Sequence, residues 1–253
     1  MERKINGLIL LIARIIAISL CLFHIYTGLF GLFPSLQQRA IHVGLSFTLL
    51  FLFNPSRTLS KDRIPWWDYT IIILLLVSAC YIYMNFLKFI PFMPKPPTIF
   101  ENFLAIITII IILEAGRRSI GIVFPIIVAF MLAYTFWGHY IPGRFGHPYI
   151  NPIFTLEKLY FSPNAIWGML TGLSATYIAL FVIFGSFLLK SGGADTFKDL
   201  ALKLSGKSIG GPAKVAVIAS GLFAMISGSS AANVATTGNF TIPMMKKMGY
   251  KPE

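Results

Sequence analysis

The chain has 253 residues, of which 56% are hydrophobic and only 12% are charged. Soluble domains have about 25% charged residues, so this composition excludes an ordinary soluble domain and predicts an integral membrane protein. The net charge of +12 is typical of nucleic-acid-binding proteins. Here, however, the Lys and Arg residues lie between apolar runs and form no basic face, so we expect no nucleic-acid partner.

Six apolar runs predict membrane-spanning helices, each of which needs about 20 mostly apolar residues. In chain order they are Ile15–Phe33, Ala40–Phe53, Tyr69–Phe86, Phe100–Ala115, Ser119–Trp137 and Thr171–Leu189. The second and fourth runs are short, and we expect each to extend by a turn at one end. Between the fifth and sixth runs the chain is polar and aromatic, which predicts a short helix at the outer surface over Thr155–Phe161.

The positive charges predict the orientation of these spans. Lys and Arg accumulate in cytoplasmic loops of membrane proteins. By the predicted topology, 15 of the 21 Lys and Arg residues lie on the side of the N-terminus, five lie on the other side, and Arg14 lies at the first boundary. The sequence therefore predicts a cytoplasmic N-terminus.

The segment after the sixth run does not fit a single crossing. Two apolar runs of about 15 to 17 residues, Gly211–Ser227 and Ala231–Met245, are separated by Gly228-Ser229-Ser230. Lysines lie before the first run and after the second, so both ends favour the cytoplasm. This pattern predicts a re-entrant helical hairpin over residues 211–245, with its tip inside the membrane.

The tip of this predicted hairpin is rich in small and polar residues. The candidate site residues are Ser227, Gly228, Ser229, Ser230, Asn233 and Thr237. Irregular backbone at membrane depth is tolerated only inside protein or beside a water-filled cavity. Opened carbonyls and Ser, Thr and Asn oxygens are ligands for a small hard cation, and a helix N-terminus favours an anionic group. The alternative is that these small residues only allow close helix packing, and composition leaves both interpretations open.

A longer motif adds to this interpretation. The stretch Ile226–Tyr250, ISGSSAANVATTGNFTIPMMKKMGY, resembles the first hairpin of the large permease subunit of tripartite ATP-independent periplasmic (TRAP) transporters. Two further segments resemble one branch of this family: Ser191-Gly-Gly-Ala-Asp195, and Lys203–Pro212, which leads into the first arm of the hairpin. In that branch the small and large membrane subunits are fused, and the partner is a TAXI-type binding protein. The resemblance is strong over residues 165–253 and architectural over 1–115, where four spans match the small subunit. It divides the chain into a small-subunit-like four-helix region, 1–115, and the beginning of a large-subunit (DctM-like) region, 116–253.

The resemblance implies a multi-pass symporter of a bacterial or archaeal cytoplasmic (inner) membrane. Such permeases import a small organic anion or carboxylate, are usually driven by a sodium gradient, and receive substrate from a periplasmic TAXI-type solute-binding protein. The resemblance implies no cofactor apart from the coupling ion. Ser227, Ser229 and Ser230 match tip positions as candidate sodium ligands, with Gly228 at the turn and Asn233 and Thr237 in the second arm. Many dicarboxylate-type subunits have Pro and Thr where this chain has Ala231 and Asn233.

Two further function classes are considered. Complete fused permeases continue well past the first hairpin, so a truncated, non-transporting membrane scaffold or assembly subunit is the main alternative. An intramembrane serine hydrolase would need a histidine base within reach of its nucleophile. The four histidines, His24, His42, His139 and His147, lie outside the hairpin, so we expect the protein not to be an enzyme.

Overall fold

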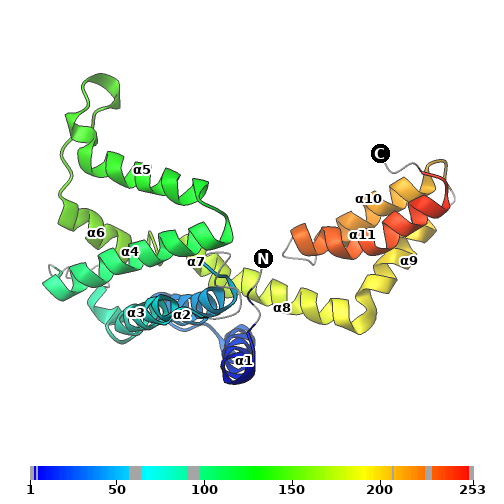
Figure 1. Ribbon diagram of the computed structural model, residues 1–253, viewed down its shortest axis with the longest axis horizontal. Coiled ribbons are helices and arrows are strands. Elements are labelled where there is room, and N and C mark those ends of the chain that lie inside the picture. Colours follow the sequence, from blue (N-terminus) through cyan, green and yellow to red (C-terminus); the bar gives the residue numbers. More distant parts are fainter. Residues whose placement is uncertain are drawn as a thin grey trace. The chain divides into compact units, whose positions relative to one another are not determined.

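The computed structural model describes residues 3, 5–56, 64–89, 97–206, 208–225 and 230–250. All regular secondary structure within these ranges is helical, which confirms the predicted all-α fold (Figure 1). The chain divides into two compact units, Met1–Ala175 and Thr176–Glu253. We describe each unit by itself. The predicted division between residues 115 and 116 concerns the family relationship and stays a prediction.

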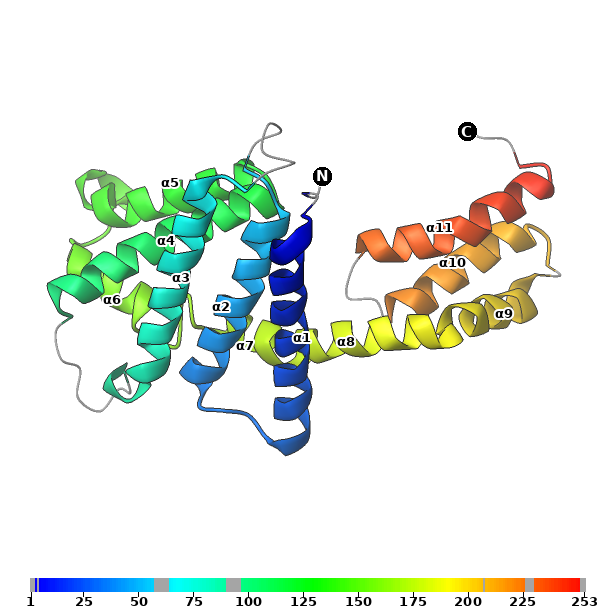
Figure 2. The same cartoon turned by 60° about the horizontal axis from the view of Figure 1, so that its bottom comes forward.

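The first unit is a set of helices that pack on their neighbours in sequence (Figure 2). They are α1 (Gly7–Phe30), α2 (Ser35–Phe53), α3 (Trp66–Met84), α4 (Ile99–Ser119), α5 (Val123–Trp137), α6 (Pro152–Tyr160) and α7 (Met169–Leu173). After α5 the chain runs back along the earlier helices: α6 packs on α4, and α7 contacts α2. The segment that follows the fifth span is therefore held against the preceding helices.

Within the described ranges, five helical segments are long and apolar enough to cross a membrane. They are Gly7–Phe30, Trp66–Met84, Ile99–Ser119, Val123–Tyr140 and Met169–Gly193. They correspond to the predicted first, third, fourth, fifth and sixth spans. In α1 only 11% of the apolar window is buried inside the protein, so most of its side chains are available to lipid. The chain is an integral membrane protein with several spans.

Some predicted boundaries are wrong. Helix α1 begins at Gly7 rather than Ile15, because Arg14 lies on the exposed helix surface and does not interrupt the helix. The fifth span begins at Val123, after Gly121 adopts a φ of 104° that an α-helix cannot include. The short helix predicted at the outer surface exists as α6, but the side chain of Tyr160 at its end is completely buried.

Helix α2 is the predicted second span, and it is not among the five apolar segments. Its first half contains five polar residues, Ser35, Gln37, Gln38, Arg39 and His42. Gln38 is buried, and its Nε2 donates to the Ala175 carbonyl at 3.0 Å. Arg39 donates to the carbonyl of Trp167. The polar half of α2 therefore bonds to other parts of the first unit, and the predicted Ala40–Phe53 covers little more than its apolar half.

Two histidines join α1, α2 and the segment after α7. His24 Nε2 lies 2.9 Å from His42 Nδ1, and His42 Nε2 lies 3.0 Å from Ser174 Oγ. Which atom donates in each contact depends on the histidine tautomers. Side-chain hydrogen bonds of this kind connect membrane helices where apolar packing gives little direction.

A buried ion cluster joins the opposite ends of these helices. Asp68, in the first turn of α3, accepts from Arg3 and from Arg118, each at 2.7 Å. The side chains of all three are at most 1% exposed. Arg3 also donates to the Phe51 carbonyl at 3.3 Å, so the cluster connects the chain before α1 with the ends of α2 and α4.

The second unit is a helical arm followed by a hairpin. A π-helix at Ser174–Ile178, which begins in the last two residues of the first unit, leads into α8 (Ala179–Leu188). A second π-helical segment, Leu189–Gly193, contains Gly192 with φ of 91°. The helices α9 (Ala194–Ser205), α10 (Gly211–Ala224) and α11 (Ser230–Lys247) follow. Helix α10 packs against both α9 and α11.

Candidate functional site

The predicted hairpin is present as α10 and α11, which lie side by side and antiparallel (Figures 1 and 2). Helices α10 and α11 correspond to the two predicted arms. That these arms form a re-entrant hairpin inside the membrane stays a prediction. Helix α10 begins sharply. Gly210 has a φ of 71°, and Pro212 stands in the first turn, where its missing N–H leaves no internal bond unmade.

The hairpin is supported by α9. Ala201 of α9 and Val215, Ala219 and Phe223 of α10 form a buried cluster with at most 1% exposure each. The Phe223 ring contacts Phe240 of α11 with a centroid distance of 6.4 Å. Gly211 is required here, because a Cβ at this position would lie 2.4 Å from the Gly206 carbonyl oxygen. The three helices therefore form one packed base for the tip.

Three of the predicted site residues, Ser227, Gly228 and Ser229, lie outside the described residues. Ser230 is the first residue of α11 and is exposed. It lies at the positive end of a helix of 18 residues, where main-chain N–H groups lack internal partners.

Asn233 joins the two arms of the hairpin close to the tip. Its Nδ2 donates to the carbonyl oxygen of Ser220 at 3.1 Å and to Ser220 Oγ at 3.3 Å. Its Oδ1 is buried and has no hydrogen-bond partner among the described residues. A buried amide oxygen without a partner loses the free energy of a hydrogen bond, so it is suited to accept from a ligand or bind a cation.

Thr237 lies one turn farther along α11 and is only 7% exposed. Its hydroxyl donates to the Asn233 carbonyl at 2.8 Å, and the hydroxyl of Thr241 donates to the Thr237 carbonyl at the same distance. The Thr237 oxygen keeps acceptor capacity after donating its proton. Asn233 and Thr237 therefore belong to one polar stripe of α11, and Ser230 precedes them at its beginning.

Sequence reasoning missed Ser220. It is a polar residue within the apolar first arm, and its carbonyl and hydroxyl hold the Asn233 amide. A polar side chain in the middle of an apolar helix signals a partner inside the protein. That signal is visible in the sequence, but only the antiparallel pairing of the arms identifies Asn233 as the partner.

The oxygen atoms of this site are neutral. No group of three or more His, Cys, Asp or Glu residues capable of holding a metal occurs in the described part of the chain. Amide, hydroxyl and carbonyl oxygens are ligands of hard cations, in contrast to the imidazole and thiolate sites of zinc and copper. The positive end of α11 at the tip favours a nearby anion. The tip can therefore combine a small cation with an anionic group.

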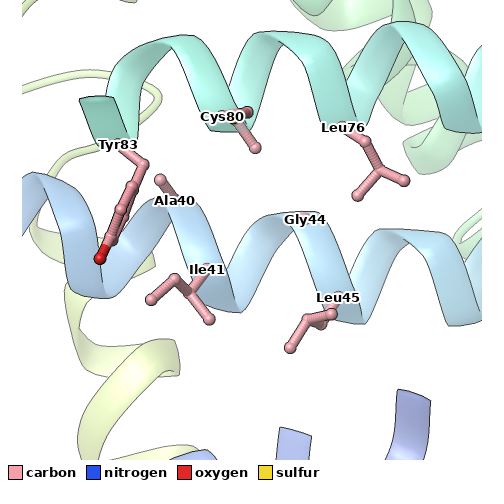
Figure 3. Close-up of a pocket in the computed structure, with 8 residues that line it drawn as sticks. Ala40, Ile41, Gly44, Leu45, Leu76, Cys80 and Tyr83 are labelled. Atoms are coloured by element: carbon pink, nitrogen blue, oxygen red, sulfur yellow. The ribbon is translucent and has the colours of Figure 1, made fainter. Parts of the chain in front are cut away.

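A groove lies in the first unit, between α2 and α3 (Figure 3). This groove of about 260 Å³ is lined by Ala40, Ile41, Gly44, Leu45, Leu76, Ala79, Cys80 and Tyr83. No charged side chain lines it, so it supplies no positive charge to balance an organic anion. The hairpin, with its buried amide oxygen that has no partner among the described residues, is the better candidate for a polar binding site.

Comparisons with known proteins identify the family of the chain. The family described as "Tripartite ATP-independent periplasmic transporter, DctM component" matches residues 107–253, which is more than half of the chain. The C4-dicarboxylate TRAP transporter large permease protein DctM of Pseudomonas aeruginosa is 36% identical over 102 residues, which cover 38% of this chain and 24% of that protein. The protein of the same name from Rhodobacter capsulatus is 30% identical over 132 residues, covering 51% of this chain and 29% of that protein.

The chain thus matches less than a third of the length of these curated relatives. No solved structure matches it. The relatives are permeases, and together with the five apolar helices they indicate a multi-pass protein of the inner membrane. Because the family match covers more than half of its length, the chain belongs to the tripartite ATP-independent periplasmic transporter family, as a DctM component.

Proposed function

We propose that this chain is the N-terminal part of a TRAP-type secondary active symporter that imports a small organic anion or carboxylate. The coupling ion is sodium, bound at the tip of the hairpin formed by α10 and α11. The observation that supports this proposal best is the buried Asn233 Oδ1, which has no partner among the described residues although the Nδ2 of the same amide is held by Ser220.

The amide is oriented by this arrangement. Since Nδ2 has two acceptors on the first arm, the oxygen must point away from them and cannot rotate freely to find a donor. Oxygen ligands that are fixed before the ion arrives lose less entropy on binding. Ser227, Ser229, Ser230 and Thr237 are the proposed further ligands, by their resemblance to the family motif, with Gly228 at the turn.

A carboxylate substrate suits the same place. The N-terminus of α11 presents main-chain N–H groups at Ser230, and a bound sodium ion adds positive charge beside them. A substrate anion and the ion would therefore bind more strongly together than separately. This mutual stabilisation is the physical basis of coupling in a symporter.

The proposed partner is a periplasmic solute-binding protein of the TAXI type. The proposal rests on the Ser191–Asp195 motif and on the four predicted spans at the beginning of the chain, which suggest a fusion of small and large membrane subunits. Three of these spans precede the family match, and the fourth overlaps its beginning at residue 107. The curated relatives are named C4-dicarboxylate transporters. A small carboxylate is accordingly the substrate class to test first.

Sodium binding is the direct test of the site. We expect Asn233→Ala to weaken binding of radioactive sodium to the purified chain by tenfold or more, because a buried charge-assisted contact contributes about 1.5–3 kcal/mol. Asn239→Ala is the matched control, since Asn239 is an exposed amide on the same helix. Equal sodium affinity in the Asn233 and Asn239 variants would eliminate the hairpin site.

Uptake then separates transport from the alternative of a non-transporting scaffold. Vesicles containing the protein and its binding protein should accumulate a labelled carboxylate only under an inward sodium gradient. Normal sodium binding with no accumulation under any gradient would favour a scaffold or assembly role for this chain.

A further inference from the structure

A cavity of about 430 Å³ lies at the base of the hairpin, between α9, α10 and α11. Its apolar lining includes Leu202, Val215, Phe240 and Met244, and two lysines, Lys198 of α9 and Lys247 of α11, also line it. Pockets for small ligands have volumes of roughly 300–1,000 Å³ and combine apolar walls with a few polar groups. This cavity has that combination, and it lies at the end of the hairpin opposite the tip.

Positive charge gathers around the cavity. Five described lysines belong to α9, α10 and α11: Lys198, Lys203, Lys214, Lys246 and Lys247. The described acidic residues of the same helices are Asp195 and Asp199. The ion pairs found in the described residues all lie in the first unit. The lysines at the base therefore remain available for an anion from outside the chain.

We propose that the cavity binds an anionic phospholipid, with the phosphate between Lys198 and Lys247 and an acyl chain against the apolar walls. Charge complementarity selects the headgroup, because lysines at a membrane surface attract anionic lipids. The apolar walls select a lipid over a free anion, since inorganic phosphate has nothing to place against Leu202, Phe240 and Met244. The Lys-rich ends of the hairpin favour the cytoplasmic membrane surface, where such headgroups lie.

This inference does not depend on sodium coupling. It requires that the base of the hairpin lies at the cytoplasmic membrane surface, and the lipid cavity shares no residue with the tip. Failure of lipid binding with normal sodium binding would remove this proposal alone, and the reverse result would remove the sodium site alone.

Native mass spectrometry of the whole chain in neutral detergent provides the test. Phosphatidylglycerol is added in one arm, phosphatidylcholine with identical acyl chains in a second, and inorganic phosphate in a third. We expect one phosphatidylglycerol to be retained in preference to the other two. Lys198→Gln with Lys247→Gln should weaken its binding by about 25-fold, since each lysine near an anionic surface contributes about a fivefold gain.

The matched control is Lys203→Gln with Lys246→Gln, which removes the same charge from the same two helices outside the cavity lining. We expect the affinity of this variant for phosphatidylglycerol to stay within about threefold of that of the unchanged protein, because neither lysine lines the cavity and exposed charges are screened by salt. Equal losses of phosphatidylglycerol binding in the two double variants would show that the lipid is attracted only by the overall positive charge of these helices. That result would overturn the cavity site. Retention of phosphate or phosphatidylcholine as strong as that of phosphatidylglycerol would overturn it as well.

A second measurement uses only the unchanged protein, so its result cannot be affected by the misfolding of a variant. Phosphatidylglycerol with a photoreactive group in its acyl chain is crosslinked to the unchanged protein, and the labelled peptides are identified. Labels should concentrate in α9 and in the second half of α11. Labels spread evenly over the apolar helices, or crosslinks between two copies of the chain at this cavity, would contradict the proposal.

Discussion

At the scale of single residues, Asp68 shows how a membrane protein uses a buried charge. Its carboxylate lies between the guanidinium groups of Arg3 and Arg118, and none of the three side chains is more than 1% exposed. Burying charges is costly, and that cost is offset only while the opposite charges remain in place. The pairing also fixes the chain before α1 against the beginning of α3 and the end of α4.

Asp68→Asn should therefore destabilise the protein strongly. It leaves two buried arginines without their common counter-charge, and breaking buried pairs in this way costs about 3–5 kcal/mol. The free energy of unfolding, measured by denaturant titration in detergent micelles, checks this value. Asp199→Asn removes an exposed carboxylate from α9 and should change the free energy by less than about 0.5 kcal/mol. Similar decreases in the free energy of unfolding in both variants would mean that the buried ion cluster does not stabilise the protein more than an exposed carboxylate does.

At the scale of elements, α6 depends on a hydroxyl cluster at its end. Tyr160 Oη lies 2.5 Å from Ser78 Oγ, and Ser78 Oγ lies 2.6 Å from Thr108 Oγ1. The three residues come from α6, α3 and α4. The short helix is therefore anchored by its last residue and by the surrounding apolar contacts.

Tyr160→Phe removes this anchor while keeping the ring. We expect a loss of about 1 kcal/mol, and hydrogen exchange over residues 152–160 should become about fivefold faster if α6 opens locally. Tyr149→Phe is the control, because Tyr149 is 66% exposed. Unchanged exchange in α6 after Tyr160→Phe would show that apolar packing alone holds the helix.

These elements also show how far sequence reasoning extends. The lengths of the apolar runs located the five long spans and both arms of the hairpin. A membrane helix needs about 20 mostly apolar residues, and such a run can be recognised from the local sequence alone. The polar half of α2 and the burial of Tyr160 were not predicted. Their partners, such as Ala175 for Gln38 and Ser78 for Tyr160, lie far away in sequence. The pairing of Asn233 with Ser220 was missed for the same reason, since it depends on how the two arms align.

At the scale of the whole molecule, the orientation in the membrane is the prediction on which the proposals depend. The positive-inside rule places the N-terminus and the base of the hairpin in the cytoplasm, with 15 of the 21 Lys and Arg residues on that side. The antiparallel arms bring the beginning of α10 and the end of α11 to the same end of the second unit. A hairpin that enters and leaves on the cytoplasmic side satisfies both observations.

Cysteine labelling tests this orientation directly. Cys21 and Cys80 are free and exposed, so both are first replaced by Ala. A cysteine introduced at exposed Lys246 should then react with a membrane-impermeant maleimide in inverted vesicles and stay unlabelled in intact cells. Arg144→Cys, at an exposed position in the segment after α5, should give the opposite pattern and serves as the control for sidedness. Labelling of the Lys246 position in intact cells would place the end of α11 outside. The two arms would then enter from the periplasmic side, and the lysines at the base would face away from the cytoplasmic lipids.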